Sequence, residues 1–448
     1  MRVLLTGAAA VFFMLLLPCS AAMAESDIER LERKIDALMR EVEALKAKEE
    51  VVGELKSEIE ALKASDRDVE TIRRAVSRME ESEQEMEELR EEVASIRDRG
   101  FEFLDRTTIG GYGELHYNDY KSEDKDSSID FHRFVLFFSH EINDWIRFDS
   151  EVELEHSLSG EGKSGEVELE QAYLDFMLSK RINVRAGLML MPVGIMNETH
   201  EPPTFYGVER PDMDKKIIPT TWWEAGVGIY GEILPGLNYR LYGVSSLDAS
   251  GFSASSGLRG GRQKVSKARA EDLALTGRLE YTGLPGLKIG GSFFWGDTSQ
   301  NDDAYGDATV TILEGDVQAS IWQFDFKGQY AHVYLDDAYE VSTANAEAVG
   351  EEMYGWYVEG GFRLLGLIFP ESEQEFALFA RYSEYDTQDE VASGFTADGK
   401  NDVEVLTIGL DYKPHPNIVI KLDYQDRDND SSTIKAADQF NLGVGYWF

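Results

Sequence analysis

The chain has 448 residues, of which 84 are acidic and 44 are lysine or arginine, and its formal net charge is −40 at pH 7. This charge argues against nucleic acid as a partner, because phosphate backbones attract basic surfaces. The single cysteine, Cys19, lies in the first 24 residues, so cysteine usage indicates nothing about the redox compartment of the remainder.

Residues 1–24 are predicted to be a secretory signal peptide. Arg2 precedes an apolar run that ends at Leu17, and Ala22-Met23-Ala24 offers small side chains at a cleavage site. The stretch before Cys19 also resembles a lipoprotein box, although Pro18 fits that pattern poorly. No later apolar run approaches the roughly 20 residues of a membrane-spanning helix. A membrane crossing would therefore require a closed β-barrel, which also satisfies its backbone polar groups in lipid.

Residues 25–100 are predicted to form a long α-helical coiled coil. Four sets of four apolar residues recur, each set 17 residues after the previous one, and the seam position after each of the first three sets is acidic. This period, about 3.4 residues per turn, indicates a left-handed, locally overwound coil about 100 Å long. The sets are Ile35, Leu38, Val42, Leu45; Val52, Leu55, Ile59, Leu62; Val69, Ile72, Val76, Met79; and Met86, Leu89, Val93, Ile96.

The sequence is compatible with three alternatives for the number of helices in the coil. Valine or isoleucine at the first seam position with leucine at the second favours a coil of two helices. Fusion to a symmetric membrane assembly favours three. A single solvated helix is the third interpretation. Gly100 is expected to end the helix.

Residues 101–448 are predicted to form an all-β transmembrane barrel of about sixteen antiparallel strands. Apolar and polar residues alternate within each run, which gives a strand one face of each kind. The predicted strands are 107–119, 129–141, 144–156, 166–178, 182–190, 221–233, 237–247, 271–282, 287–297, 314–321, 323–336, 352–365, 374–386, 406–413, 418–427 and 440–448.

The links between these strands alternate in length, as in outer-membrane barrels. The exception is a longer inner turn at residues 366–373. This parity places both chain ends in the periplasm, so the coil is expected to project into the periplasm. The long links are 120–128, 157–165, 191–220, 248–270, 298–313, 337–351, 387–401 and 428–435; the short ones are 142–143, 179–181, 234–236, 283–286 and 414–415.

Charged residues on the face opposite the apolar stripe are predicted to line the pore. A sixteen-stranded barrel leaves an aqueous channel, and a cation facing lipid at midplane would cost about 2–4 kcal/mol. The alternative is that these residues only wet the lumen and form ion pairs with each other. The predicted pore-lining residues are Arg133, Arg147, Arg185, Arg240, Arg278, Arg363, Arg381, Lys421, Asp149 and Glu151, with Lys327, Arg427, Glu153 and Glu155 on the same face.

The link 191–220 contains five prolines and residues of both charges. Proline stiffens a loop by restricting φ, and a stiff charged loop inside the lumen would narrow the pore and set its field. The sequence leaves open whether this loop enters the lumen. The predicted constriction residues are Glu198, Glu201, Glu209, Arg210, Asp212, Asp214, Lys215 and Lys216.

Acidic residues are frequent in the other long links. Their simplest role is solubility at the membrane surface, and the alternative is binding of divalent cations that bridge lipopolysaccharide.

Several short motifs, taken in order, carry a family resemblance. They are the signal peptide, Gly110-Gly111-Tyr112-Gly113-Glu114-Leu115, Gln171-Ala172-Tyr173-Leu174-Asp175-Phe176, the long link after Gly187, and the terminal Tyr446-Trp447-Phe448. Over about residues 101–448 the chain resembles a trimeric bacterial outer-membrane porin of the phosphate-selective porin O/P family. The resemblance implies passive diffusion of small hydrophilic solutes through water-filled homotrimers in outer-membrane lipid and lipopolysaccharide. Some relatives use inward arginines and lysines to prefer phosphate.

Two other functions compete with this prediction. The seven histidines are scattered without catalytic or metal-ligand spacing, so we expect no enzyme activity, cofactor or metal, and an outer-membrane phospholipase or protease is a weak alternative. A periplasmic rod could also tether the outer membrane to peptidoglycan or another envelope component.

Overall fold

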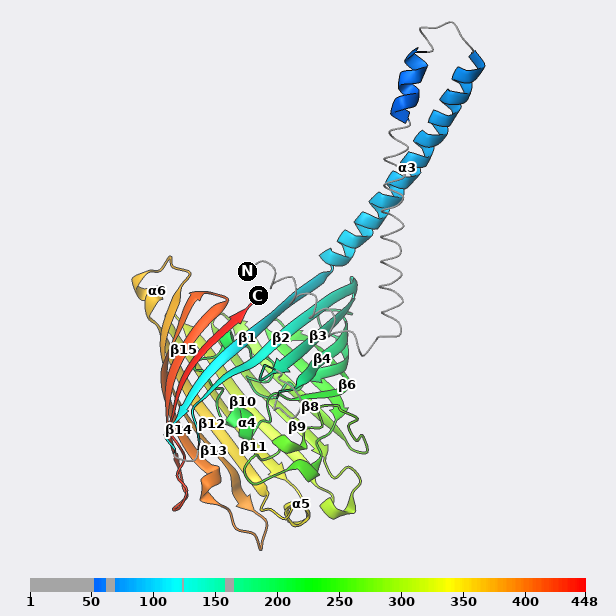
Figure 1. Ribbon diagram of the computed structural model, residues 1–448. Coiled ribbons are helices and arrows are strands. Elements are labelled where there is room, and N and C mark those ends of the chain that lie inside the picture. Colours follow the sequence, from blue (N-terminus) through cyan, green and yellow to red (C-terminus); the bar gives the residue numbers. More distant parts are fainter. Residues whose placement is uncertain (1–51, 62–68, 123–124, 158–164) are drawn as a thin grey trace. The chain divides into compact units, whose positions relative to one another are not determined.

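The computed structural model describes residues 52–61, 69–122, 125–157 and 165–448. Sixteen antiparallel strands form one closed barrel, in which each strand pairs with its neighbours in sequence and β1 pairs with β16 (Figure 1). The predicted strand number and barrel class are confirmed. The strands are β1 (Thr107–Tyr120), β2 (Ser128–Asn143), β3 (Ile146–Glu155), β4 (Val167–Phe176), β5 (Asn183–Leu190), β6 (Trp223–Leu234), β7 (Leu237–Ser245), β8 (Leu273–Leu284), β9 (Leu287–Asp297), β10 (Thr309–Ile321), β11 (Phe324–Leu335), β12 (Gly350–Arg363), β13 (Glu375–Val391), β14 (Asp402–His415), β15 (Ile418–Asn429) and β16 (Gln439–Trp447).

The C-terminal residue takes part in closing the barrel. Gly111 and Phe448 exchange two backbone hydrogen bonds, with N···O distances of 3.0 and 2.9 Å. In the same ladder Tyr112 lies opposite Trp447. The run of alternating residues that ends the sequence therefore supplies the last strand of the cylinder.

Side-chain burial follows the alternation in the sequence. On β14, Leu406 and Ile408 are 39% and 57% exposed, whereas Val405 and Thr407 between them are 3% and 2% exposed. In a closed barrel the exposed apolar face is the one available to lipid, and the other face points into the lumen.

The connections follow the predicted parity. Figure 1 shows α6 (Leu364–Ile368) and the C-terminus at one end of the barrel and α5 (Ala338–Asn345) at the other. The other short helices of the barrel links are η1 (Pro202–Thr204), α4 (Met213–Lys216), η2 (Ala249–Gly251), η3 (Arg259–Gly261), η4 (Asp303–Tyr305) and η5 (Gly399–Asn401).

A separate compact unit lies N-terminal to the barrel, with the boundary between Phe103 and Leu104. Its main helix, α3 (Val69–Asp105), continues past Gly100, so the prediction that this glycine ends the helix is wrong. Glycine within a helix costs only about 1 kcal/mol relative to alanine. A second helix spans 52–61, and the signal peptide and predicted coil residues 25–51 and 62–68 lie outside the described residues. Among the described helices, none has the length and apolar character needed to cross a membrane.

Candidate functional site: the segment inside the barrel

The long link 191–220, called the lumen segment below, lies inside the barrel. It contacts strands around the whole circumference, which only an internal segment can do. These contacts include Asn118 on β1 with Glu209, Glu170 on β4 with His200, Arg240 on β7 with Glu198, Ser292 on β9 with Gly194, Asp325 on β11 with Tyr206, Arg381 on β13 with Tyr206 and Lys421 on β15 with Phe205.

Apolar packing anchors one side of the lumen segment. Met213, Ile217 and Ile218 are fully buried, in one cluster with inward residues of β9 to β12 such as Phe294 and Val333. Burial of each such side chain contributes roughly 1.5–3 kcal/mol. Part of the lumen is therefore a dry core, although the sequence predicted an aqueous interior.

Cationic side chains of the barrel wall hold the backbone of the segment on its other side. They donate hydrogen bonds to four successive carbonyl oxygens, and Asp423 accepts one from the Val208 amide at 2.7 Å. The carbonyl contacts are Lys413 to Pro203 (3.1 Å), Lys327 to Thr204 (3.1 Å), Lys421 to Phe205 (2.8 Å) and Arg381 to Tyr206 (2.6 Å). Arg381 and Lys421, both predicted to line the pore, thus position the lumen segment.

Inward glycines provide space for the segment. A Cβ atom on Gly361 would lie 2.4 Å from the Tyr206 ring, and one on Gly445 would lie 2.3 Å from Pro202. The inward stripe of β16, in which Gly443 and Gly445 follow Asn441, is the sequence feature that could have indicated this close approach.

Asn197 fixes the two ends of the segment. Its side-chain nitrogen donates to the carbonyl oxygens of Met191 (2.8 Å) and Trp222 (2.7 Å), and its side-chain oxygen accepts from the Trp222 amide (2.8 Å). Sequence reasoning did not find this residue, because an isolated asparagine in a loop has no distinguishing pattern.

Two cavities border the lumen segment, and Phe205 lines both. The outer cavity, about 840 Å³, lies toward the long links, and the inner cavity, about 470 Å³, lies toward the short turns. The outer cavity is lined by nine basic and five acidic side chains: Lys125, Arg133, Arg210, Lys215, Lys216, Arg259, Lys400, Arg427 and Lys435, against Glu114, Glu155, Glu209, Asp212 and Asp214. The inner cavity is lined by four basic and three acidic side chains: Lys288, Lys327, Arg363 and Lys413, against Asp325, Glu375 and Asp411.

A basic cluster (Arg210, Lys215, Lys216 and Arg259) lies on the wall of the outer cavity. One buried guanidinium nitrogen of Arg210 and one of Arg259 have no hydrogen-bond partner. Burial, followed by repulsion from neighbouring cations, lowers the pKa of both Arg259 and Lys215. The cluster therefore gathers positive charge that the surrounding acids only partly balance.

Acidic side chains of β3 and β4 form a second buried group. Glu151, Glu153 and Glu170 are at most 2% exposed, and His200 of the lumen segment lies 3.3 Å from Glu170. None of these three carboxylates lines either cavity.

The remaining predicted pore residues occupy three kinds of position. Arg133 and Arg363 line the outer and inner cavities respectively. The other predicted cations and Asp149 line neither cavity and form ion pairs. These pairs are Arg147 with Asp149 and Asp175, Arg185 with Asp175, Arg240 with Glu198, and Arg278 with Asp316 and Glu314.

Six of the eight predicted constriction residues line the outer cavity: Glu209, Arg210, Asp212, Asp214, Lys215 and Lys216. Glu198 pairs with Arg240 at 3.4 Å, and Glu201 precedes η1 without capping it through its side chain.

The closed sixteen-stranded barrel with an internal segment defines a porin-type channel. The sequence profile of the family described as phosphate-selective porin O and P matches residues 108–443, and the chain belongs to this family. An uncharacterized protein of Aquifex aeolicus (strain VF5) is 36% identical over 335 residues, which cover 72% of this chain and 76% of that protein.

Two solved structures show the same fold. The outer-membrane channel DcaP of Acinetobacter baumannii is similar with a TM-score of 0.50 and 13% identity, over 76% of this chain and 97% of that one. OmpF of Salmonella typhi, in complex with daunomycin, is similar with a TM-score of 0.50 and 12% identity, over the same shares of the two chains. Family and fold identify an outer-membrane channel for passive diffusion of small hydrophilic solutes, and not an enzyme.

Proposed function

We propose that this porin prefers anions and that an oxyanion with the charge of phosphate binds at the basic cluster. The excess of nine basic over five acidic side chains in the outer cavity carries the proposal. The unpartnered guanidinium nitrogens of Arg210 and Arg259 are donors that an oxyanion would satisfy.

The net charge of −40 does not oppose this preference. Charges separated from the pore by more than about 10 Å of salt solution are screened at 0.1 M ionic strength. The acids Glu151, Glu153 and Glu170 are buried and line neither cavity, and Glu153 pairs with Arg133 at 3.6 Å. An ion in the outer cavity therefore meets the local basic excess more strongly than the charge of the whole chain.

The reversal potential of the channel in a bilayer under a potassium chloride gradient tests the proposal. The wild type should be anion-selective, and phosphate should reduce its chloride conductance. Replacing Arg210, Lys215 and Arg259 by glutamine should move the reversal potential toward zero. Each lost charge-assisted contact is worth about 1.5–3 kcal/mol, which corresponds to roughly 10- to 150-fold weaker phosphate binding per arginine.

Lys180→Gln is the matched control, because it removes one positive charge at an exposed short turn. Its reversal potential and phosphate block should equal those of the wild type. Unchanged selectivity in the triple variant, or cation selectivity in the wild type, would contradict an anion-preferring cavity.

We also propose that α3 contributes to a periplasmic coiled coil in a homotrimer. Val76 of its predicted seam is 38% exposed, and Met79, Met86 and Leu89 are only partly buried, so the single chain leaves this stripe available to other helices. Cross-linking in native membranes should give trimers; monomers alone would contradict the proposal.

A tether to peptidoglycan or another envelope component is the second role proposed for this rod. Deletion of residues 25–100 should leave channel conductance intact and weaken attachment of the outer membrane to the cell wall. Unchanged attachment would remove this role and leave the channel function untouched.

A further inference from the structure

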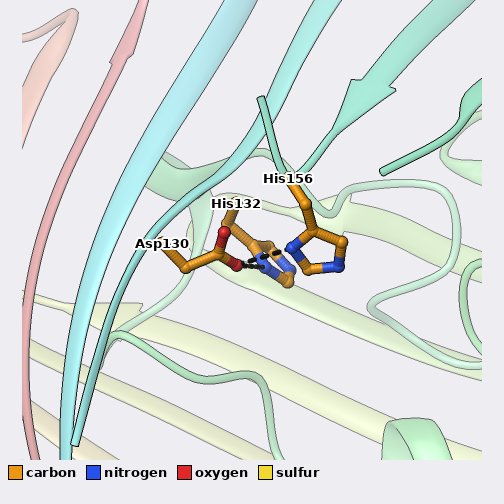
Figure 2. A group of neighbouring side chains, drawn as sticks. All are labelled: Asp130, His132 and His156. Atoms are coloured by element: carbon orange, nitrogen blue, oxygen red, sulfur yellow. Dashed lines mark hydrogen bonds and ion pairs between the residues drawn. The ribbon is translucent and has the colours of Figure 1, made fainter. Parts of the chain in front are cut away.

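Two histidines and an aspartate converge where β2 and β3 reach the long-link end of the barrel (Figure 2). The Nδ1 atoms of His132 and His156 lie 3.2 and 2.8 Å from the same oxygen, Oδ2 of Asp130. The three side chains are between 28% and 36% exposed, and both histidines line the outer cavity. The group is therefore accessible to ions in the channel.

Backbone irregularities bring these side chains together. The β1–β2 register shifts by one residue between the pairs Glu114–Arg133 and His116–Asp130, so β2 has an extra residue at this point. Such a bulge redirects a side chain, and the neighbours His132 and Arg133 consequently both reach the outer cavity. His156 follows β3 with φ of +50°, and its amide donates to the His132 carbonyl at 3.0 Å.

We infer that Asp130, His132 and His156 bind a divalent transition-metal ion of the zinc type in the wall of the outer cavity. All three ligand atoms lie within 4.8 Å of one another. Tetrahedral zinc with ligand bonds of about 2.0–2.1 Å places its ligands roughly 3.4 Å apart. Small side-chain rotations reach that geometry, and the open side leaves the fourth position to water or an anion.

Residues next to the proposed ligands hold the His132 ring in place. The His116 ring stacks on His132 with centroids 4.8 Å apart and an interplanar angle of 12°. His116 in turn contacts Glu114 at 3.1 Å and Glu209 at 3.4 Å. These contacts restrain the His132 ring. Groups of this kind influence metal affinity by about 10- to 100-fold.

Calorimetric titration of the purified full-length protein with zinc chloride tests the site. The wild type should bind one zinc ion per chain. His132→Ala and His156→Ala should each weaken binding by at least about 100-fold, because a lost ligand has a larger effect than a lost outer contact. Asp130→Asn should also weaken binding, although its amide oxygen could still accept the hydrogen bonds. His415→Ala, at an exposed short turn, should bind zinc as the wild type does.

A second measurement separates this site from the basic cluster. Zinc should move the reversal potential of the wild type toward anion selectivity, because the ion adds positive charge to the cavity, and should leave that of His132→Ala unchanged. Heat-modifiable migration on gels should match the wild type in each variant, which shows that the barrel is folded. Absence of saturable zinc binding to the wild type, or equal binding by the His132→Ala/His156→Ala double variant, would overturn the assignment. The zinc-free reversal potential tests the proposed anion preference independently.

Discussion

One side of the lumen segment packs against apolar side chains of the barrel wall, whereas the other side forms hydrogen bonds with charged side chains. On the apolar side, Met213 and Ile217 pack with inward residues of β9 to β12 such as Ile312. On the charged side, wall residues such as Lys421 and Arg381 donate hydrogen bonds to backbone carbonyls. Hydrophobic burial is strong and non-directional, whereas charge-assisted hydrogen bonds are directional.

This difference indicates that the two sides have different structural roles. The apolar side stabilises the position of the segment, and the charged side sets its register and leaves a cavity lined by ionic groups. A channel with only the charged side would leave a segment that water and salt could displace. Four substitutions, in order of decreasing expected effect, test this difference between the two sides.

Trp222→Ala should have the largest effect, because it removes the largest fully buried side chain at the base of the segment. Loss of a buried tryptophan costs about 3–5 kcal/mol. The variant should unfold at lower temperature, and the released segment should make single-channel conductance larger and noisier. A conductance equal to that of the wild type would show that the apolar side does not hold the segment in place.

Lys421→Met should loosen the charged side. The substitution removes two hydrogen bonds, to the carbonyl oxygens of Phe205 and Gly207, and leaves Lys413 as the remaining cation beside Asp411. Breaking one partner of a buried ionic contact costs about 3–5 kcal/mol, reduced here by water in the lumen. Conductance fluctuations should increase. Lys288→Met, in the inner cavity wall, is the control and should leave them unchanged.

Gly361→Ala tests the close packing between wall and segment. The added methyl group would meet the Tyr206 ring at 2.4 Å, whereas nothing lies within 4 Å of a Cβ on Gly360. Overpacking costs typically about 1–3 kcal/mol. Denaturant unfolding should therefore show lower stability for Gly361→Ala than for Gly360→Ala. Equal stability of the two variants would contradict a fixed Tyr206.

Asp214 should add a small pH dependence to selectivity. Burial raises the pKa of its carboxyl to about 7, against the lowering influence of Arg381, the Gln329 hydrogen bond, Arg210 and Lys327. The carboxyl is neutral below that pH and negative above it, so anion selectivity should decrease between pH 6 and pH 8. Asp214→Asn should reduce the change in reversal potential measured across this range; an undiminished change would assign the titration to another group.

The sequence by itself determined the barrel, the strand number and the alternation of links. These properties depend on local periodicity, since lipid-facing and lumen-facing side chains alternate along each strand. Runs such as 440–448 therefore identified both the strand and its apolar face. The prolines and charges of 191–220 also marked the segment that matters for the channel, without showing where it lies.

Only the tertiary structure decided what each inward charge does. Arg133 and Arg381 occupy equivalent positions in the sequence pattern, yet Arg133 lines the outer cavity and Arg381 binds the segment backbone. The dry core and the convergence of Asp130, His132 and His156 were likewise not predictable. The dry core joins a loop to strands far apart in sequence, and a two-residue period contains no information about which groups meet across the lumen. The group of Asp130, His132 and His156 depends on a bulge in β2 and on the positive φ of His156, which strict alternation does not predict.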